Sequence, residues 1–263
     1  MSFPDTERLA RVGLRADLAG AVLTVTLDRP GRRNSQSPGQ WYALGDLGTS
    51  LPDEVRVVVV RGAGASFSAG IDTRLLGPEG VEGEDSVHDL MRGSDEHVLE
   101  TIDAYQRGFT WLADPRFVSV AQVHGHAIGA GFQLALACDL RVVADDALFC
   151  MKEPALGLVP DLAGTKPLVE LVGYSRALEI CATARFVGAE EARALGIATA
   201  VVPGAELEAT TADLVEALLS SDAGAVRETT ALLQSARSLG LEEQRLAERQ
   251  AQLRRFRALV GGD

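Results

Sequence analysis

The chain has 263 residues, of which 46% are hydrophobic and 24% are charged, and its formal net charge is −12. These values predict a soluble globular protein that can bury a large core, and they argue against a nucleic-acid or anionic-membrane surface, which would need clustered Lys and Arg. The three cysteines lack metal-ligand spacing, so we expect buried reduced thiols, no metal and a cytoplasmic protein. We identify no secretory signal or membrane-spanning run in the sequence.

Two segments in the first half of the chain predict strands. Residues 21–28 alternate hydrophobic and polar side chains, which is the period of a half-buried strand. Residues 55–61 are almost continuously β-branched, which is typical of a parallel strand covered on both faces. Between them, Ser37 and Pro38 predict a helix N-cap and first turn. We expect that helix to continue to about residue 47.

Three loops around these elements are candidate ligand contacts. The basic turn that contains Arg29, Arg32 and Arg33 is either a solvated turn or a contact for a phosphate-bearing ligand. The glycine-rich turn 62–70 departs from the dinucleotide-binding spacing, so its glycines are expected to let the backbone approach a ligand closely. Residues 76–94 are acidic and rich in glycine, which predicts a mobile loop over the site or an exposed insertion.

The central stretch 118–165 organises the chain. A predicted strand, 117–123, leads through a glycine-rich turn into a short apolar helix, 132–138. Such a turn leaves free backbone N–H groups at the helix start, where the helix dipole also favours negative charge. Glu153 and Asp161 follow the next β-branched run. Two acids near a backbone anion site suggest proton transfer beside a polarised carbonyl group.

The remaining sequence is mostly helical. The last predicted helix, 241–259, is amphipathic and is expected to pack on its own domain or on a neighbouring subunit. We predict one α/β domain, with a core over residues 1–203 and a helical C-terminal region over residues 204–263. The other elements expected here are a strand at 199–202 and helices at 95–113, 164–171, 174–182, 189–195, 206–220 and 224–237.

Several ordered blocks of the sequence resemble the crotonase superfamily, the enoyl-CoA hydratase and isomerase group. The blocks are DRPGRRNS (28–35), VRVVVVRGAGASFSAGID (55–72), VHGHAIGAGFQLALACDLRVVADDALF (123–149), EPALGLVPDLAGT (153–165) and FVGAEEARALGIATAVVP (186–203). The resemblance implies a crotonase-like ββα superhelix with a helical C-terminal trimerisation region. It also implies a homotrimer or a dimer of trimers, and an acyl-CoA thioester substrate without a separate cofactor.

The resemblance also implies roles for individual residues. Two backbone N–H groups would hold the thioester oxygen, and the family motifs place them at Ser68 and Ala130. Glu153 and Asp161 would be the catalytic acids. The substrate would contact the following residues: Arg33, Ser68, Ala69, Gly70, Ile71, Ala130 and Gln133.

The acids leave the reaction open. Hydratases of the group have a second glutamate where this chain has Gln133, which cannot titrate. Dienoyl-CoA isomerases share the spacing of Glu153 and Asp161, and the chain is similar to them in this respect, although they have an aspartate at position 133. We therefore expect movement of a double bond in an enoyl- or dienoyl-CoA. Hydration, thioester hydrolysis and non-catalytic acyl-CoA binding are alternatives, and Asp161 could also be only the N-cap of the following helix.

Overall fold

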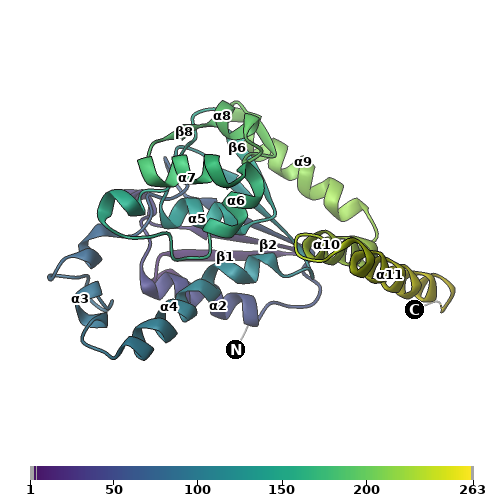
Figure 1. The fold of residues 1–263 in the computed structure, drawn as a ribbon, viewed down its shortest axis with the longest axis horizontal. Helices are drawn as coiled ribbons and strands as arrows, with labels where there is room; N and C mark the ends of the chain where they lie inside the picture. The colour runs from purple at the N-terminus through teal and green to yellow at the C-terminus, as the bar shows by residue number, and fades with distance from the viewer. Residues whose placement is uncertain (1–2, 4, 262–263) are drawn as a thin grey trace.

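A computed structural model describes residue 3 and residues 5–261 of the protein. Figure 1 shows a mixed α/β core from which the C-terminal helices project as an arm. The main sheet has six strands in the order β1-β2-β3-β4-β6-β9, of which only β1 and β2 are antiparallel neighbours. Its strands are β1 (Leu14–Ala19), β2 (Val22–Leu27), β3 (Val57–Gly62), β4 (Val118–Val123), β6 (Leu140–Ala144) and β9 (Ala200–Val202).

Strand β3 explains why the core forms where it does. Val58 and Val60 face one hydrophobic cluster, together with side chains of the helices that cover that face of the sheet. Val57 and Val59 face a second cluster on the opposite side, where helix α9 packs. The burial of both faces confirms the prediction made from the continuous β-branched run.

A second sheet positions the candidate site. It contains three short strands, in which β5 is parallel to β7 and β7 is antiparallel to β8. The segment around Ser68 adds a single parallel bridge to Ala127 in this sheet. The loops that follow β5 and β7 therefore begin side by side. The strands are β5 (His126–Ile128), β7 (Leu148–Cys150) and β8 (Val187–Gly188).

Helices of the first two-thirds of the chain surround the sheets. Helices α2 and α4 pack against each other over the main sheet, and α5 contacts β5, α4 and α6. These helices are α1 (Thr6–Arg11), α2 (Pro38–Thr49), α3 (Val87–Leu90), α4 (Asp95–Thr110), α5 (Ala130–Ala137), α6 (Thr165–Val172), α7 (Tyr174–Thr183) and α8 (Ala189–Ala194). The 3-10 turns are η1 (Pro30–Arg32), η2 (Thr73–Leu76), η3 (Trp111–Ala113), η4 (Glu153–Leu156) and η5 (Gly204–Glu206).

The C-terminal region is helical, as predicted. Helix α9 (Leu207–Ser220) covers part of the sheet, and α10 (Ala223–Ser235) and α11 (Leu241–Gly261) form a hairpin that extends from the core (Figure 1). Ala251 of α11 is buried, whereas Phe256 on the hydrophobic side identified from the sequence is 57% exposed. The apolar side of this helix is thus not covered within one chain. Among the described residues, no helix is both long and apolar enough to cross a membrane.

The structure differs from the predicted start of α2. Ser37 precedes Pro38 at the helix start, but its hydroxyl makes no capping hydrogen bond and instead donates to Glu84. The Glu84 carboxylate accepts the Gly39 N–H at 2.8 Å, so an acid from the 76–94 segment satisfies the helix N-terminus. This segment, expected to be a loop, also contains the short helix α3.

Candidate active site

Glu153 is a buried carboxylate at the start of η4, just after strand β7. Its side chain accepts a hydrogen bond at Oε1 from the Gln133 amide, at 2.6 Å. The second oxygen, Oε2, is buried without a hydrogen-bond partner among the described residues. Desolvation raises the pKa of Glu153, the hydrogen bond from Gln133 opposes that shift, and the nearby charge of Asp161 adds to it. An unpartnered carboxylate oxygen with a raised pKa is suited to accept a proton.

Gln133 joins Glu153 to the segment that carries the second acid. Its side chain is fully buried on α5, and its Oε1 accepts the N–H groups of Leu162 at 2.9 Å and Gly164 at 3.2 Å. A Cβ at position 164 would lie 2.6 Å from the Gln133 Cγ, so this close approach needs glycine. The sequence placed Gln133 only as a pocket residue, whereas the structure gives it three hydrogen bonds.

Asp161 lies between η4 and α6, within electrostatic range of Glu153. The Gln106 side chain of α4 donates to its backbone carbonyl at 2.7 Å. Asp161 is exposed as a residue, but the protein around its carboxyl group still raises its pKa by desolvation. Gly164 is the N-cap of α6, so the alternative in which Asp161 caps this helix does not match the structure.

The backbone N–H of Ser68 differs from its expected role. It donates to the His126 carbonyl at 2.8 Å, because the segment around Ser68 pairs with β5. The Ser68 hydroxyl is also occupied, since it donates to the Asn34 carbonyl at 2.8 Å and accepts from Gln36 at 3.0 Å. Ser68 therefore anchors the turn, and its N–H is not free to bind a substrate oxygen.

Two other N–H groups in these turns are free. Within the described part of the chain, neither the Ile71 N–H nor the Ala130 N–H has a hydrogen-bond acceptor. The Ala130 N–H is the first of helix α5, where the helix dipole favours negative charge. A Cβ on Gly70 would lie 3.5 Å from the Ala130 nitrogen and 2.4 Å from the Ile128 carbonyl oxygen. The turn at Gly70 thus brings the two free donors close together.

Gly70 also provides a test of this close approach. Its φ of +83° and the contact with the Ile128 carbonyl leave no room for a side chain. We expect Gly70→Ala to lower the free energy of unfolding by roughly 2–5 kcal/mol, from left-handed strain together with overpacking. The matched control is Gly157→Ala, where φ is +76° but no atom lies within 4 Å, so only the strain of about 1–2 kcal/mol is expected. Denaturant unfolding compares the two, and equal losses would contradict the close approach.

The arginine turn divides into structural and exposed residues. Arg29 donates to the Ser35 carbonyl at 2.8 Å and pairs with Asp72, so it holds the turn together. Arg33 is exposed, in the left-handed region with a φ of 49°, and its carbonyl accepts the Ala69 N–H at 2.8 Å. Of these two arginines, only Arg33 has a guanidinium at the surface.

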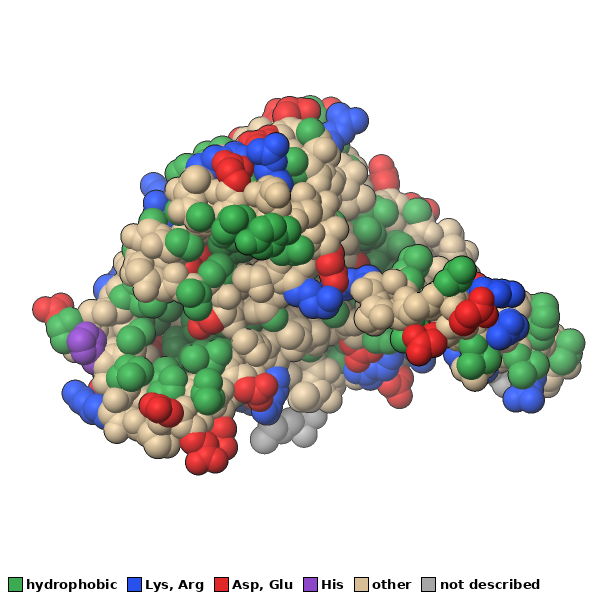
Figure 2. Space-filling model, in the orientation of Figure 1, with side chains coloured by type: hydrophobic (Ala, Val, Ile, Leu, Met, Phe, Trp, Pro, Cys, Tyr) green, Lys and Arg blue, Asp and Glu red, His purple; other side chains and the backbone are tan. Residues whose placement is uncertain are grey.

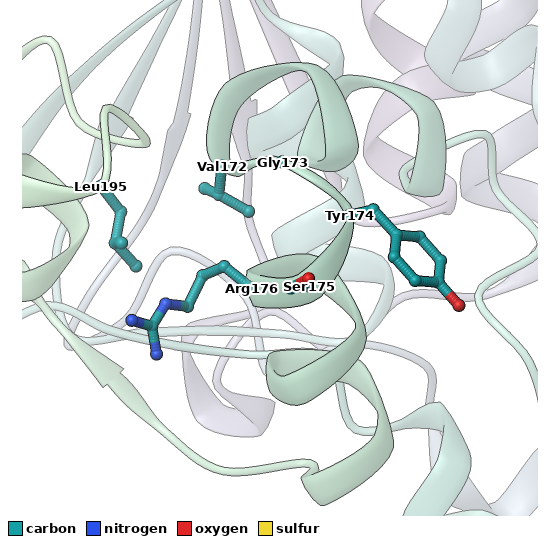
Figure 3. A pocket seen from close by; sticks show the side chains of 6 residues that line it. All are labelled: Val172, Gly173, Tyr174, Ser175, Arg176 and Leu195. Carbon is teal, nitrogen blue, oxygen red and sulfur yellow. The ribbon is translucent and has the colours of Figure 1, made fainter.

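Figure 2 shows a hollow lined mainly by hydrophobic side chains between the α6–α7 region and the α3–α4 region. The exposed hydrophobic side chains of this part of the molecule lie near α3, on α4 and between the two acids, and they are Val87, Met91, Leu99, Leu156, Leu158 and Val159. Another surface pocket, of about 650 Å³, lies around the α6–α7 junction (Figure 3). It contains no acid and shares no residue with the Glu153 site, so we place no chemistry there.

Sequence comparisons relate the chain to proteins of acyl-CoA metabolism. Residues 17–258 match the family described as Enoyl-CoA hydratase/isomerase. A peroxisomal Delta(3,5)-Delta(2,4)-dienoyl-CoA isomerase of Arabidopsis thaliana is 30% identical over 88% of this chain and 83% of its own length. The carnitinyl-CoA dehydratase of Escherichia coli K12 is 33% identical over 85% of this chain and 81% of its own length.

Solved structures give the same relationship. A candidate enoyl-CoA hydratase of Thermobifida fusca YX, in complex with CoA, is 47% identical with a TM-score of 0.94, and the match covers 99% of both chains. A structure from the same organism in complex with acetoacetyl-CoA is 48% identical with a TM-score of 0.93, over 97% of this chain and 99% of the other. These neighbours share the crotonase-like fold, which confirms the fold predicted from the sequence.

Proposed function

Because the chain belongs to the enoyl-CoA hydratase/isomerase family, we propose that it moves a double bond along an enoyl- or dienoyl-CoA by proton transfer. The observation that carries this proposal is the pairing of Glu153 with Gln133. One buried acid presents a free oxygen, and the residue that could have been a second buried acid is an amide that cannot titrate. Asp161 is then the acid that can exchange a proton with a different carbon. The resemblance to a dienoyl-CoA isomerase agrees with this reaction.

The proposed substrate is an acyl-CoA thioester. Its support is the likeness to Thermobifida fusca structures solved with CoA and with acetoacetyl-CoA. The N–H groups of Ile71 and Ala130 would hold the thioester oxygen, and the exposed Arg33 would lie near the CoA phosphates. The hydrophobic hollow of Figure 2 would take the acyl chain. No cofactor is needed, because the CoA group is part of the substrate.

The proton transfer follows from these contacts. Glu153 Oε2 removes a proton from the carbon next to the conjugated system, and the electron pair of that C–H bond moves toward the thioester oxygen. The Ile71 and Ala130 N–H groups stabilise the resulting negative charge. A proton from Asp161 or Glu153 then adds at another carbon as the electrons return. The product has the mass of the substrate, and the acids together regain the protons they held at the start.

Hydration is the second candidate, because the chain is 33% identical to a carnitinyl-CoA dehydratase. Adding water needs one group to deprotonate the water and one to protonate the α-carbon. Gln133 can do neither, so Glu153 and Asp161 would have to supply both functions. This requirement makes isomerisation the better supported reaction.

Product masses in heavy-oxygen water distinguish the reactions. The substrates are 2-enoyl-, 3-enoyl-, 3,5-dienoyl- and 3-hydroxyacyl-CoA thioesters. We expect products of unchanged mass and shifted retention from the 3-enoyl and dienoyl thioesters. Label in the acyl chain would establish hydration instead, and label in a free acid would establish thioester hydrolysis. Binding of every thioester without any product would identify a non-catalytic acyl-CoA-binding protein.

Asp161→Asn tests the second acid. We expect it to reduce kcat for a 3,5-dienoyl-CoA by roughly 10²-fold or more, because a distant carbon needs a second proton donor. A 3-enoyl-CoA should lose less than tenfold, because Glu153 alone can serve its nearby carbons. Steady-state rates with both substrates measure this difference. Equal losses would remove Asp161 from the dienoyl reaction.

We also propose that the protein is a cytoplasmic homotrimer or dimer of trimers. The support is the uncovered apolar side of α11, which a neighbouring copy would bury. Its exposed side chains are Leu246, Leu253, Phe256 and Val260. Figure 1 shows that the α10–α11 hairpin extends away from the core, where it can reach a second copy.

A further inference from the structure

We propose that Gln133 is a positioning residue that leaves Glu153 a single reactive oxygen and holds the segment carrying Asp161 beside it. This inference deepens the proposed function and rests on it for its catalytic meaning. Gln133 is fully buried, and both ends of its amide are occupied. The donor end meets Glu153, and the acceptor end meets the 162–164 backbone.

The partners fix the orientation of the amide. Leu162 and Gly164 present N–H groups, which can only donate, and an ionised Glu153 can only accept. If the amide were flipped, its NH₂ group would face the two backbone donors and its oxygen would face the Glu153 carboxylate. All three hydrogen bonds would be lost in a buried place, which is unfavourable. The Gln133 nitrogen must therefore face Oε1 of Glu153.

Oε1 is enclosed on a second side as well. A Cβ on Gly129 would lie 3.2 Å from it, so the backbone at Gly129 closes the space beside this oxygen. Oε2 has no partner among the described residues and is the oxygen left for a substrate proton. The titratable groups whose charges interact with Glu153 are Asp161, Cys150 and Cys181. Lys152 is its neighbour in the chain.

The test is Gln133→Glu in the full-length protein. The new side chain has the same length and keeps an acceptor for the Leu162 and Gly164 N–H groups, so the fold is expected to persist. It loses the donor to Glu153 and places a second carboxyl group 2.6 Å from it, so the two groups must share a proton. We expect the titration midpoint assigned to Glu153 to rise by at least one pH unit.

Carbon-13 NMR of protein labelled at the glutamate carboxyl groups measures this midpoint, and the signal is assigned by its loss in Glu153→Gln. The second readout is uptake of deuterium from heavy water at the α-carbon of hexanoyl-CoA. Its acidic limb should move to higher pH by the same amount, with at least a tenfold loss of rate at pH 7. An unchanged NMR midpoint would overturn the proposal.

The matched control is Gln40→Leu. Gln40 is also a fully buried glutamine, but it lies on α2 and its amide donates only to the Gly13 carbonyl, at 3.1 Å. We expect this control to leave the Glu153 midpoint and the exchange rate unchanged. An equal shift in the control would show a general effect of disturbing the core and would also overturn the positioning role.

The proposal and the proposed function can fail separately. If the natural protein does not exchange the α-proton of hexanoyl-CoA, Glu153 is not a carbon base and the proposed function fails. The NMR titration does not depend on turnover and still tests the contact between Gln133 and Glu153. If exchange occurs but Gln133→Glu does not move the midpoint, only the role of Gln133 is overturned.

Discussion

Glu153→Gln is expected to abolish double-bond movement while leaving the protein folded. An amide has nearly the shape of the carboxyl group but cannot accept the substrate proton. We expect kcat/KM for a 3-enoyl-CoA to fall by roughly 10²–10⁴-fold, the usual contribution of a positioned general base. Steady-state kinetics measure the loss. The control is Glu54→Gln, an exposed glutamate outside the candidate site, which should keep full activity.

The same substitution has an opposite effect on stability. Burial raises the pKa of Glu153 in the folded state, so folding favours the protonated form. The natural protein therefore loses stability as the pH rises from the ordinary glutamate pKa through the raised folded pKa. Glu153→Gln removes the charge and this pH dependence. We expect it to be at least as stable as the natural protein at pH 8 in denaturant unfolding.

The pH dependence of activity follows from the same shift. Glu153 works as a base only when it is ionised, and its raised pKa places the acidic limb of the natural protein's kcat/KM above the ordinary value for glutamate. Retained activity in Glu153→Gln would contradict the assignment of the base. A stability profile unchanged by the substitution would contradict the buried, ionised carboxylate.

The sequence was sufficient for the elements whose patterns are strong. The β-branched run of β3 and the alternation of β2 predicted both strands, because burial on two faces or one face leaves these periods directly. Strand β1 was missed, although Leu14 and Ala16 are buried and Arg15 and Asp17 are exposed. Its alternation is short and depends partly on alanine, which is a weak hydrophobic signal.

The details of the site needed three-dimensional structure. Glu153 and Asp161 were found from their motif, but the bridge that Gln133 makes between Glu153 and the backbone at Gly164 depends on two segments far apart in sequence. The Ser68 N–H could not be excluded as a ligand from sequence, because its partner is a carbonyl of β5. Hydrogen bonds between distant segments leave no periodic pattern in the sequence.

Ala130→Pro is expected to remove one of the two proposed oxyanion donors while preserving helix α5. Proline is well tolerated at the first position of a helix, where its missing N–H would have no partner within the helix. Gly129 precedes it and has no Cβ to clash with the proline ring. We expect kcat/KM to fall by roughly 10²–10³-fold, as when one oxyanion donor is lost.

Two measurements separate this effect from damage to the fold. Ala130→Gly keeps the N–H and should retain activity within about tenfold, because no oxyanion donor is removed. Free CoA has no thioester oxygen, so its affinity for Ala130→Pro, measured by calorimetry, should equal that of the natural protein. A proline variant that binds CoA normally but has lost turnover would locate the defect at the thioester oxygen. A fully active proline variant would show that negative charge is stabilised elsewhere, because the ring leaves no N–H at Ala130 to stabilise it.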